Sequence, residues 1–283
     1  MAARSRVLAV VNQKGGVGKT TTAVNLAAYL ARAGRPTLLV DLDPQANASS
    51  AYGGPGSRPH VYDTLVGGVA VKEAIAPTEV DGLALLPSGP DLVGAEVELV
   101  ELPGREQQLG RALAEVRDGC RHIIVDCPPS LGLLTLNALC AADEVLIPLQ
   151  CEYYALEGLV RLLETTDTVR RNLNPRLRLA GILLTMVDLR SNLARQVQEE
   201  VMRHFGRYVF RTAIPRNIRL SEAPSYGKPI LLYDPRSRGA LAYEALAREL
   251  IAREEPLHAP GASAASAVET SAVDQGGDDG PAT

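Results

Sequence analysis

The stretch VLAVVNQKGGVGKTT, residues 7–21, runs from an apolar strand pattern into a glycine-rich turn that ends in Lys-Thr-Thr. Residues 22–31 then carry apolar side chains at helical spacing, and Gly34 stops the pattern, which predicts a helix. A strand, a glycine-rich turn and a helix in this order make a phosphate cradle, because successive backbone N–H groups converge at the helix N-terminus. The stretch therefore predicts a nucleotide-binding P-loop.

The two lysines of this loop are not equivalent. Lys19 is expected to lie along the β- and γ-phosphates, with the Thr20 hydroxyl on Mg²⁺. The usual P-loop spacing would place a glycine at position 13, but the chain has Gln13 there and a second lysine, Lys14, directly after it. A lysine at the mouth of the loop is oddly placed for the nucleotide that the loop itself holds. The expected nucleotide-binding residues of the loop are Lys14, Gly15, Gly16, Val17, Gly18, Lys19, Thr20 and Thr21.

Length and composition limit the protein class. With 283 residues and 46% hydrophobic content, the chain can bury one large core, and 4% aromatic residues without Trp suit an α/β domain packed from Ala, Leu and Val. No stretch approaches the length of a membrane-spanning helix, and the first apolar run is too short for a signal peptide. We therefore expect a cytoplasmic protein. The cysteines form no Cys-x-x-Cys pair, so buried thiols are expected at Cys120, Cys127, Cys140 and Cys151.

Strand and helix patterns alternate along the chain. This alternation predicts an α/β fold with a doubly wound, mostly parallel sheet and ligands at the carboxyl ends of the strands. We expect strands at residues 7–11, 37–41, 83–87, 122–126, 144–148 and 179–184, with a weaker one at 208–210. Helices are expected at residues 22–31, 92–101, 107–116, 133–141, 156–171, 192–205 and 240–252.

The charges are distributed unevenly. Residues 1–160 carry an excess of six acidic side chains, residues 161–253 an excess of eight basic ones, and residues 254–283 an excess of six acidic ones. The basic third favours an anionic partner, although solvated arginine-rich helices would give the same count. We expect one folded domain over residues 1–253. Residues 254–283 are rich in Ala, Ser, Gly and Asp, and we expect an acidic, disordered tail there.

Carboxylates follow two of the expected strands. Asp41 and Asp43 stand at the end of the second strand, and Asp126 ends the 122–126 strand, where an acid can hold Mg²⁺ through water. One such acid alone could be a helix cap or a turn residue, but acids at two strand ends beside a P-loop favour a nucleotide site. The turn Ile214–Asn217 is polar and, from the residues alone, could be a simple turn.

These motifs together resemble a known family. The loop at residues 14–20, Asp41–Gln45, Asp126–Ser130 and Ile214–Asn217 are similar to the deviant Walker A ATPases of the ParA/MinD superfamily. Residues 220–230 and 233–240 resemble the chromosomal ParA (Soj) branch. The similarity covers about residues 4–253, and the acidic tail lies outside the family pattern.

The resemblance implies a role for each cluster. Lys14 resembles the signature lysine that crosses a nucleotide-sandwich homodimer to the phosphates bound by the other subunit. Asp43 would orient the attacking water, with Lys14 as the other catalytic residue. The implied Mg²⁺ site uses Thr20, Asp41 and Asp126, and Pro215 and Asn217 would frame the adenine of ATP.

The resemblance also gives the basic third a purpose. An ATP-dependent dimer would present two cationic surfaces to double-stranded DNA, without sequence preference because no element is suited to reading a groove. Arg190 and Arg219 match family positions that contact DNA. The full set of candidates is Arg190, Arg195, Arg219, Lys228, Arg236 and Arg238.

The implied function is an ATPase that segregates chromosomal or plasmid DNA. A ParB-type centromere-binding partner would stimulate its slow hydrolysis, and the protein would associate with the nucleoid rather than a membrane. The alternative is a MinD-like positioning ATPase on a membrane surface. That alternative needs an amphipathic C-terminal helix with Lys or Arg beside bulky apolar residues, which the tail lacks.

Overall fold

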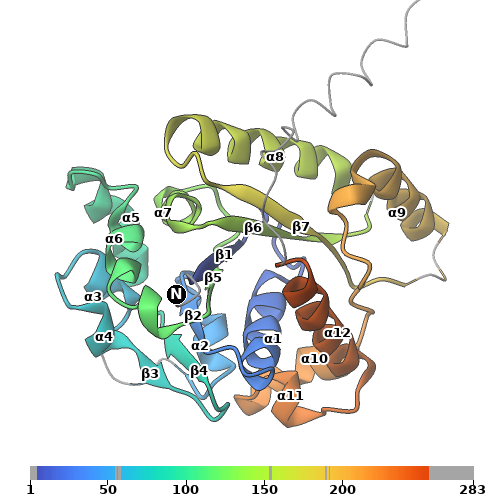
Figure 1. The fold of residues 1–283 in the computed structure, drawn as a ribbon, viewed down its shortest axis with the longest axis horizontal. Coiled ribbons are helices and arrows are strands. Elements are labelled where there is room, and N and C mark those ends of the chain that lie inside the picture. Colours follow the sequence, from blue (N-terminus) through green and yellow to red (C-terminus); the bar gives the residue numbers. More distant parts are fainter. Residues whose placement is uncertain are drawn as a thin grey trace, which may run out of the picture.

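The computed structural model describes residues 5–54, 56, 59–152, 155–188, 190 and 192–254. Its centre is a seven-stranded sheet with the order β3-β4-β2-β5-β1-β6-β7 (Figure 1). Neighbouring strands are parallel except for β3, which pairs antiparallel with β4. The sheet confirms the predicted doubly wound α/β fold. The strands are β1 (Arg6–Val10), β2 (Thr37–Asp41), β3 (Ala76–Pro77), β4 (Leu83–Leu86), β5 (His122–Asp126), β6 (Glu144–Gln150) and β7 (Arg178–Thr185).

The register of the central strands aligns their carboxyl ends. Asp126 at the end of β5 lies opposite Val10 of β1 on one side and opposite Asp41 of β2 on the other. Parallel pairing is what allows this, because every strand then ends at the same edge of the sheet. The P-loop after β1 and the acids of β2 and β5 are therefore brought together.

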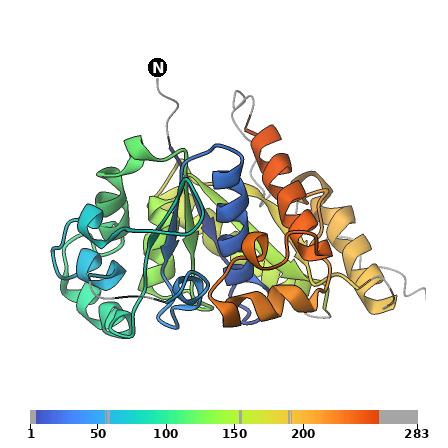
Figure 2. The ribbon, with the colours of Figure 1, turned by 90° about the horizontal axis from the view of Figure 1, so that it is seen from below.

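Helices cover both faces of the sheet (Figures 1 and 2). Each face has its own apolar core, built from Leu, Val, Ile and Ala side chains. One face is covered by α1 (Lys19–Arg32), α2 (Asn47–Ser50), α10 (Ile218–Glu222), α11 (Ile230–Tyr233) and α12 (Arg238–Ala252). The other is covered by α3 (Val61–Leu65), α4 (Val71–Ala74), α5 (Leu92–Glu98), α6 (Gln108–Ala114), α7 (Leu133–Ala141), α8 (Ala155–Asn172) and α9 (Asn192–Phe205). Within the described part of the chain, no helix has the length and apolar character needed to cross a membrane.

The expected strand at residues 208–210 is wrong. Residues Gly206–Tyr208 form a 3₁₀ turn, and Val209 makes only an isolated parallel bridge with Ile182. Phe210 packs so closely over Gly181 that a Cβ on that glycine would lie 2.6 Å from its ring. The segment therefore runs beside β7 in the same direction but bonds to it only at intervals, through Phe210 N to Ile182 O at 2.9 Å and Ile214 N to Leu184 O at 2.9 Å.

Glu254, which we expected to begin the tail, is part of the folded domain. Its side chain is only 3% exposed and lies within 3.3 Å of Arg6 and Arg121 and 3.7 Å of Arg35. It also contacts the ring of His122. Burial would raise the pKa of Glu254, but the hydrogen bond and charge of His122 and the charge of Arg6 bring it below its ordinary value. Residues 255–283 lie outside the described residues.

Removal of this carboxylate is expected to destabilise the domain. Glu254→Ala leaves cationic side chains clustered at the amino ends of β1 and β5 without their shared counter-charge, which we expect to cost about 2–4 kcal/mol of unfolding free energy. Glu157→Ala, which removes an exposed partner of Arg161 on α8, is the matched control and should cost less than about 1 kcal/mol. Urea unfolding measures both, and equal losses would contradict a clustered role for Glu254.

Candidate functional site

The loop between β1 and α1 has the backbone geometry of a phosphate cradle. Gly16 and Gly18 have φ of 76° and 87°, in the left-handed region that favours glycine. A Cβ at Gly15 or Gly16 would meet no atom within 4 Å, so the space over the loop is open. Gly18 directly precedes α1, whose first residues include Thr20 and Thr21, so the helix N-terminus faces this space.

Hydrogen bonds to β6 and β7 hold the loop in place. The Thr185 hydroxyl at the end of β7 donates to Val17 O at 2.8 Å. The Asn12 side chain donates to Pro148 O of β6 at 2.7 Å and accepts from Lys14 N at 3.0 Å. The loop is thus fixed to two strands by side chains that lie outside the glycine motif.

The two lysines of the loop have different surroundings. Lys19 is 6% exposed, and its Nζ donates to Lys14 O at 3.1 Å, so it bends back over its own loop. Burial lowers the pKa of Lys19, although Asp126 and Asp43 work against this. The Lys14 side chain is 51% exposed and makes an ion pair with Glu152, which follows β6 and is 45% exposed. Lys14 therefore points out of the site that Lys19 occupies.

Asp126 is a buried carboxylate with no close hydrogen-bond partner among the described residues, although the Thr20 hydroxyl is near enough to lower its pKa. Both of its oxygens are buried and accept no hydrogen bond from the described residues. Burial and the charge of Asp41 raise the pKa of Asp126 well above its ordinary value, and Thr20 and Lys19 only partly offset this. Buried polar groups in native proteins almost always have a partner, so this side chain fits a site for a cation.

Asp41 and Asp43 have different surroundings. Asp41 Oδ2 accepts from the backbone N and the hydroxyl of Ser49, both at 2.7 Å, and Oδ1 accepts from Asp43 N at 3.2 Å. Burial raises the pKa of Asp41 to about 6 despite these bonds. Asp43 Oδ1 accepts from Gln45 N at 2.9 Å. Both oxygens of Asp41 thus accept hydrogen bonds from the protein, and Asp41 holds the backbone that carries Asp43.

Two serines extend this network. Ser88 follows β4, and its hydroxyl donates to Asp43 O at 2.7 Å, while its backbone N donates to the Ser49 hydroxyl at 2.9 Å. Ser49 on α2 therefore connects Asp41 to the Ser88 segment. The result is a closed set of hydrogen bonds that fixes the Asp43 loop.

The donor set fits Mg²⁺ bound together with phosphates. Within the described ranges, no three His, Cys, Asp or Glu side chains are grouped as a complete metal site. Mg²⁺ commonly uses only one or two carboxylates, with substrate phosphates and water as further ligands. The unpartnered Asp126 and the nearby Thr20 hydroxyl match that pattern.

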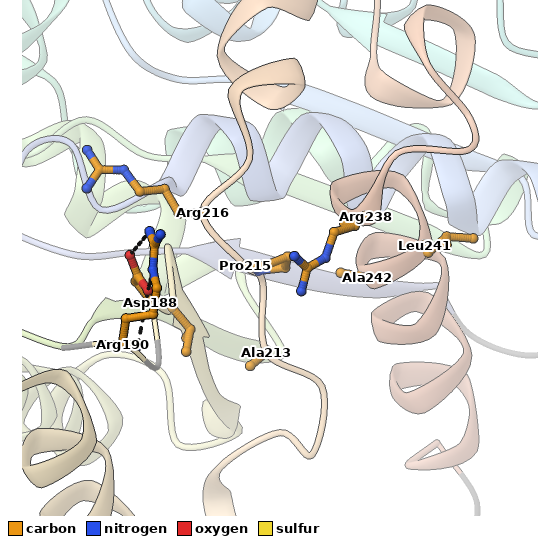
Figure 3. Close-up of a pocket in the computed structure, with 9 residues that line it drawn as sticks. Asp188, Arg190, Ala213, Pro215, Arg216, Arg238, Leu241 and Ala242 are labelled. Carbon is orange, nitrogen blue, oxygen red and sulfur yellow. Dashed lines mark hydrogen bonds and ion pairs between the residues drawn. The ribbon is translucent and has the colours of Figure 1, made fainter. Parts of the chain in front are cut away.

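A cavity of about 870 Å³ lies beside Pro215, between the segment that follows β7 and the start of α12 (Figure 3). Three arginines line it, and Figure 3 shows Arg190 joined to Asp188, with Arg238 reaching from the start of α12 toward Pro215. Asn217 is not among the lining residues; its side chain accepts from Arg219 N at 2.8 Å and caps α10. The lining residues are Val187, Asp188, Arg190, Ala213, Pro215, Arg216, Arg238, Leu241 and Ala242.

The six candidate DNA contacts are all exposed and come from several elements. Arg190 and Arg238 share the cavity, whereas Arg195 lies on α9 and Arg219 on α10. Lys228 and Arg236 lie in the loops on either side of α11. Several are paired with polar neighbours. Arg190 bonds to Asp188 at 2.6 and 2.8 Å, Arg219 bonds to Glu222 at 2.9 Å, and Arg195 contacts Asn192.

Comparison with known proteins decides the family. Residues 5–179 match the family model described as "AAA domain". The chain is 56% identical over 253 residues to a chromosome partitioning protein ParA from Myxococcus xanthus, covering 89% of each chain. It is 55% identical to the sporulation initiation inhibitor protein Soj from Bacillus subtilis, covering 87% of this chain and 98% of that one.

The chain belongs to the ParA/Soj family of chromosome-partitioning ATPases. Among solved structures, cobyrinic acid a,c-diamide synthase from Mycobacterium smegmatis, with an ATP analogue and magnesium bound, is similar with a TM-score of 0.77 and 41% identity. That alignment covers 89% of this chain and 96% of the other. These likenesses confirm the family resemblance read from the P-loop and the strand-end acids.

For this ParA/Soj family member, the motifs located the loop and the acids but missed residues that support them. Ser49, Ser88 and Glu152 carry no local signal, because Ser49 and Ser88 bond to each other across 39 positions and Glu152 pairs with the distant Lys14. Arg216 was part of a motif but was not proposed as an anion contact, although it lines the cavity with two of the proposed arginines.

Ser49 is expected to act as a positioning residue. Ser49→Ala removes hydrogen bonds to the buried Asp41 and to Ser88, which should lower the unfolding free energy by about 1–3 kcal/mol. Because the network fixes the Asp43 loop, ATP hydrolysis should fall more than nucleotide affinity does. Ser50→Ala is the matched control and should stay within about 0.5 kcal/mol of the parent protein. Urea unfolding and ATP turnover provide the measurements; identical behaviour of the two variants would contradict the network.

Proposed function

We propose that this chain is a DNA-segregation ATPase for chromosome or plasmid partitioning, in which an ATP-bound homodimer binds DNA and a ParB-type partner stimulates release. The observation that carries the ATPase part is the buried Asp126 at the end of β5, whose oxygens accept no close hydrogen bond within the described part of the chain and which lies beside Lys19 at the start of α1. Relatives named as chromosome-partitioning proteins over most of the chain support the biological role. Nucleoid association would follow from DNA binding.

The P-loop residues would bind the nucleotide. The backbone N–H groups of residues 15–21 and the Lys19 ammonium would hold the ATP phosphates, and the helix N-terminus would favour their negative charge. Asp126 and the Thr20 hydroxyl would hold Mg²⁺, with Asp41 behind them. Bound Mg²⁺ would neutralise charge on the phosphate oxygens. Pro215 and the amide nitrogen of Asn217 would contact the adenine, since the amide oxygen of Asn217 already caps α10.

Asp43 and Lys14 would act on hydrolysis. Asp43 would use a carboxylate oxygen to orient the attacking water, and its position is set by Ser88 and Asp41. Lys14 would reach the phosphates of the other subunit, which explains why it points away from its own loop. Its pairing with Glu152 must then be exchanged for the phosphate contact. An exposed ion pair of this kind contributes only about 0–1 kcal/mol, so the exchange costs little.

The DNA surface would be formed by the basic third of the chain. The excess of eight basic residues over positions 161–253 supports this, and so does the cavity lined by Arg190, Arg216 and Arg238. Binding of this type depends on phosphate contacts and counterion release, so it is independent of sequence and weakens steeply with salt. The paired acids Asp188 and Glu222 would be displaced from their arginines by phosphates. A dimer would gain further affinity because its two surfaces act together.

Replacement of Lys19 and replacement of Lys14 should have different effects. Lys19→Ala should weaken ATP binding by about 10- to 100-fold, because a charge-assisted hydrogen bond to phosphate is removed. Lys14→Ala should keep most of its ATP affinity and lose hydrolysis and the stable dimer. Calorimetry measures binding, and sedimentation with ATP measures dimerisation. A Lys14→Ala protein that dimerises with ATP as the parent does would overturn the cross-subunit role.

Charge reversal of the arginines tests the DNA surface. Arg190→Glu or Arg219→Glu should abolish binding to duplex DNA while ATP-dependent dimerisation persists. A milder Arg190→Ala should reduce the salt slope by about one unit for each phosphate that is no longer neutralised, so by about two in a dimer. Arg161→Glu, on the exposed face of α8, is the control and should bind DNA nearly as well as the parent.

The measurement is a titration of labelled duplexes of unrelated sequence at several salt concentrations, with anionic liposomes in parallel. If both reversals bind DNA normally, the contact surface lies elsewhere. Binding to liposomes in place of DNA would favour the MinD-like alternative instead.

A further inference from the structure

The cavity beside Pro215 combines an excess of positive charge with an apolar wall (Figure 3). Arg190, Arg216 and Arg238 line it, and the only acid among the lining residues is Asp188. The apolar wall is built from Val187, Ala213, Pro215, Leu241 and Ala242. Leu241 is 55% exposed, so this wall is not covered by the rest of the described chain. The cavity therefore suits a ligand that has an anionic part and an apolar part.

Asp188 does not neutralise the arginines of this cavity. Its carboxylate accepts hydrogen bonds from the Arg190 side chain at 2.6 and 2.8 Å. These bonds, with a smaller effect from the charge of Arg216, lower the pKa of Asp188 to about 2. Arg216 and Arg238 form no ion pair with the residues that the structure describes. Two guanidinium groups are therefore left to bind an anionic ligand.

The segment that follows the folded domain contains a short repeat with this chemistry. Residues 266–269 read SAVE and residues 271–274 read SAVD, so each copy places a valine directly before a carboxylate. Residues 255–283 contain five acidic side chains and no Lys or Arg. The repeat thus offers, twice, one apolar side chain and one anionic group next to each other.

The domain holds the start of this segment at a suitable distance from the cavity. Glu254 is fixed by ion pairs at the amino edge of the sheet, and α12 runs from there back to the cavity. At 1.5 Å per residue, the 15 residues of α12 span about 22 Å. From Glu254 to the repeat there are 12 to 20 residues. A coil of that length reaches about 17–27 Å, which matches the span and favours contact within one chain.

We propose that residues 266–274 dock in the cavity beside Pro215 of the same chain. A valine of the repeat would lie against Leu241, and the carboxylate that follows it would bind Arg216 and Arg238. Charge-assisted hydrogen bonds to guanidinium groups are among the stronger ones, and the short tether supplies a local concentration in the millimolar range. A free phosphate would satisfy the arginines but would leave the apolar wall exposed.

Docking would cover part of the proposed DNA surface, because Arg190 and Arg238 belong to both. The repeat would then compete with DNA phosphates for the same cations. An ATP-bound dimer binds DNA through two surfaces at once, so DNA would displace the repeat from the dimer more readily than from the monomer. This competition, unlike the docking itself, rests on the proposed function.

The docking is tested with a fluorescent peptide of residues 264–276, titrated with the whole chain. In the variant E269Q/D274N the chain's own repeat has lost its charges, so the peptide should bind to the open cavity. The parent chain should bind the peptide about 10-fold more weakly, because its tethered repeat competes. D278N/D279N removes the same number of charges outside the repeat and should behave as the parent does.

Substitutions in the cavity identify the binding site. R216A/R238A, combined with E269Q/D274N, should weaken peptide binding by about 10-fold or more, because both guanidinium partners are removed. L241S should also weaken it, since the apolar contact is lost. Arg248→Ala, which removes an exposed arginine farther along α12, is the control and should leave binding unchanged. Urea unfolding of each variant confirms that it is folded.

Titration of labelled duplex DNA measures the competition. E269Q/D274N should bind DNA about 3- to 10-fold more tightly than the parent, because its cavity is open. D278N/D279N should bind DNA with the affinity of the parent, although it carries the same net charge as E269Q/D274N.

The outcomes separate docking, diffuse charge and simple anion binding. Peptide binding that R216A/R238A leaves unchanged overturns the docking, and so does an equal gain in DNA affinity in both variants of the segment. Displacement of the peptide by millimolar inorganic phosphate, together with full binding in L241S, overturns it as well and assigns the cavity to small anions. Peptide binding that needs the arginines, with DNA affinity unchanged in E269Q/D274N, supports the docking and contradicts only the competition. If neither the parent nor any variant binds DNA, the proposed function is contradicted instead.

Discussion

Negative charge buried at the carboxyl edge of the sheet is the constraint on which the site depends. Asp41, Asp43 and Asp126 are all buried there, with Lys19 as the buried cation beside them. Burial raises the pKa values of Asp41 and Asp126, and repulsion between the neighbouring carboxylates adds to this rise. The hydrogen bonds of Ser49 relieve Asp41 alone. The negative charge that remains uncompensated lies where a bound Mg²⁺ ion would supply positive charge.

The same constraint explains what could be predicted from the sequence. The P-loop and the acids of β2 and β5 are local patterns, and parallel pairing places the strand ends together once the alternation of strands and helices is recognised. The fold class, most strands and most long helices followed from periodicity. Short elements such as α10 and α11 did not, because four or five residues carry too little periodicity to be distinguished from a turn.

The parts that could not be predicted depend on contacts between distant residues. Ser49 and Ser88 are 39 positions apart, and neither has a neighbour in sequence that marks it. The segment at 208–210 has a strand pattern, but Phe210 packs over Gly181 and the segment bonds to β7 only at isolated positions. Glu254 begins a segment whose composition is typical of a disordered tail. Only its ion pairs with arginines at the starts of three strands show that it belongs to the domain.

The ion pairs of Glu254 also determine where a label or tether can be joined to the protein. The last turn of α12 and the first residue of β1 meet at the amino edge of the sheet, while the P-loop and its acids lie at the opposite, carboxyl edge (Figure 2). A fluorescent protein or a surface tether joined at either of these points would lie away from the nucleotide site. Single-molecule or immobilised assays can therefore attach the protein at the amino edge and keep the carboxyl edge open to solvent.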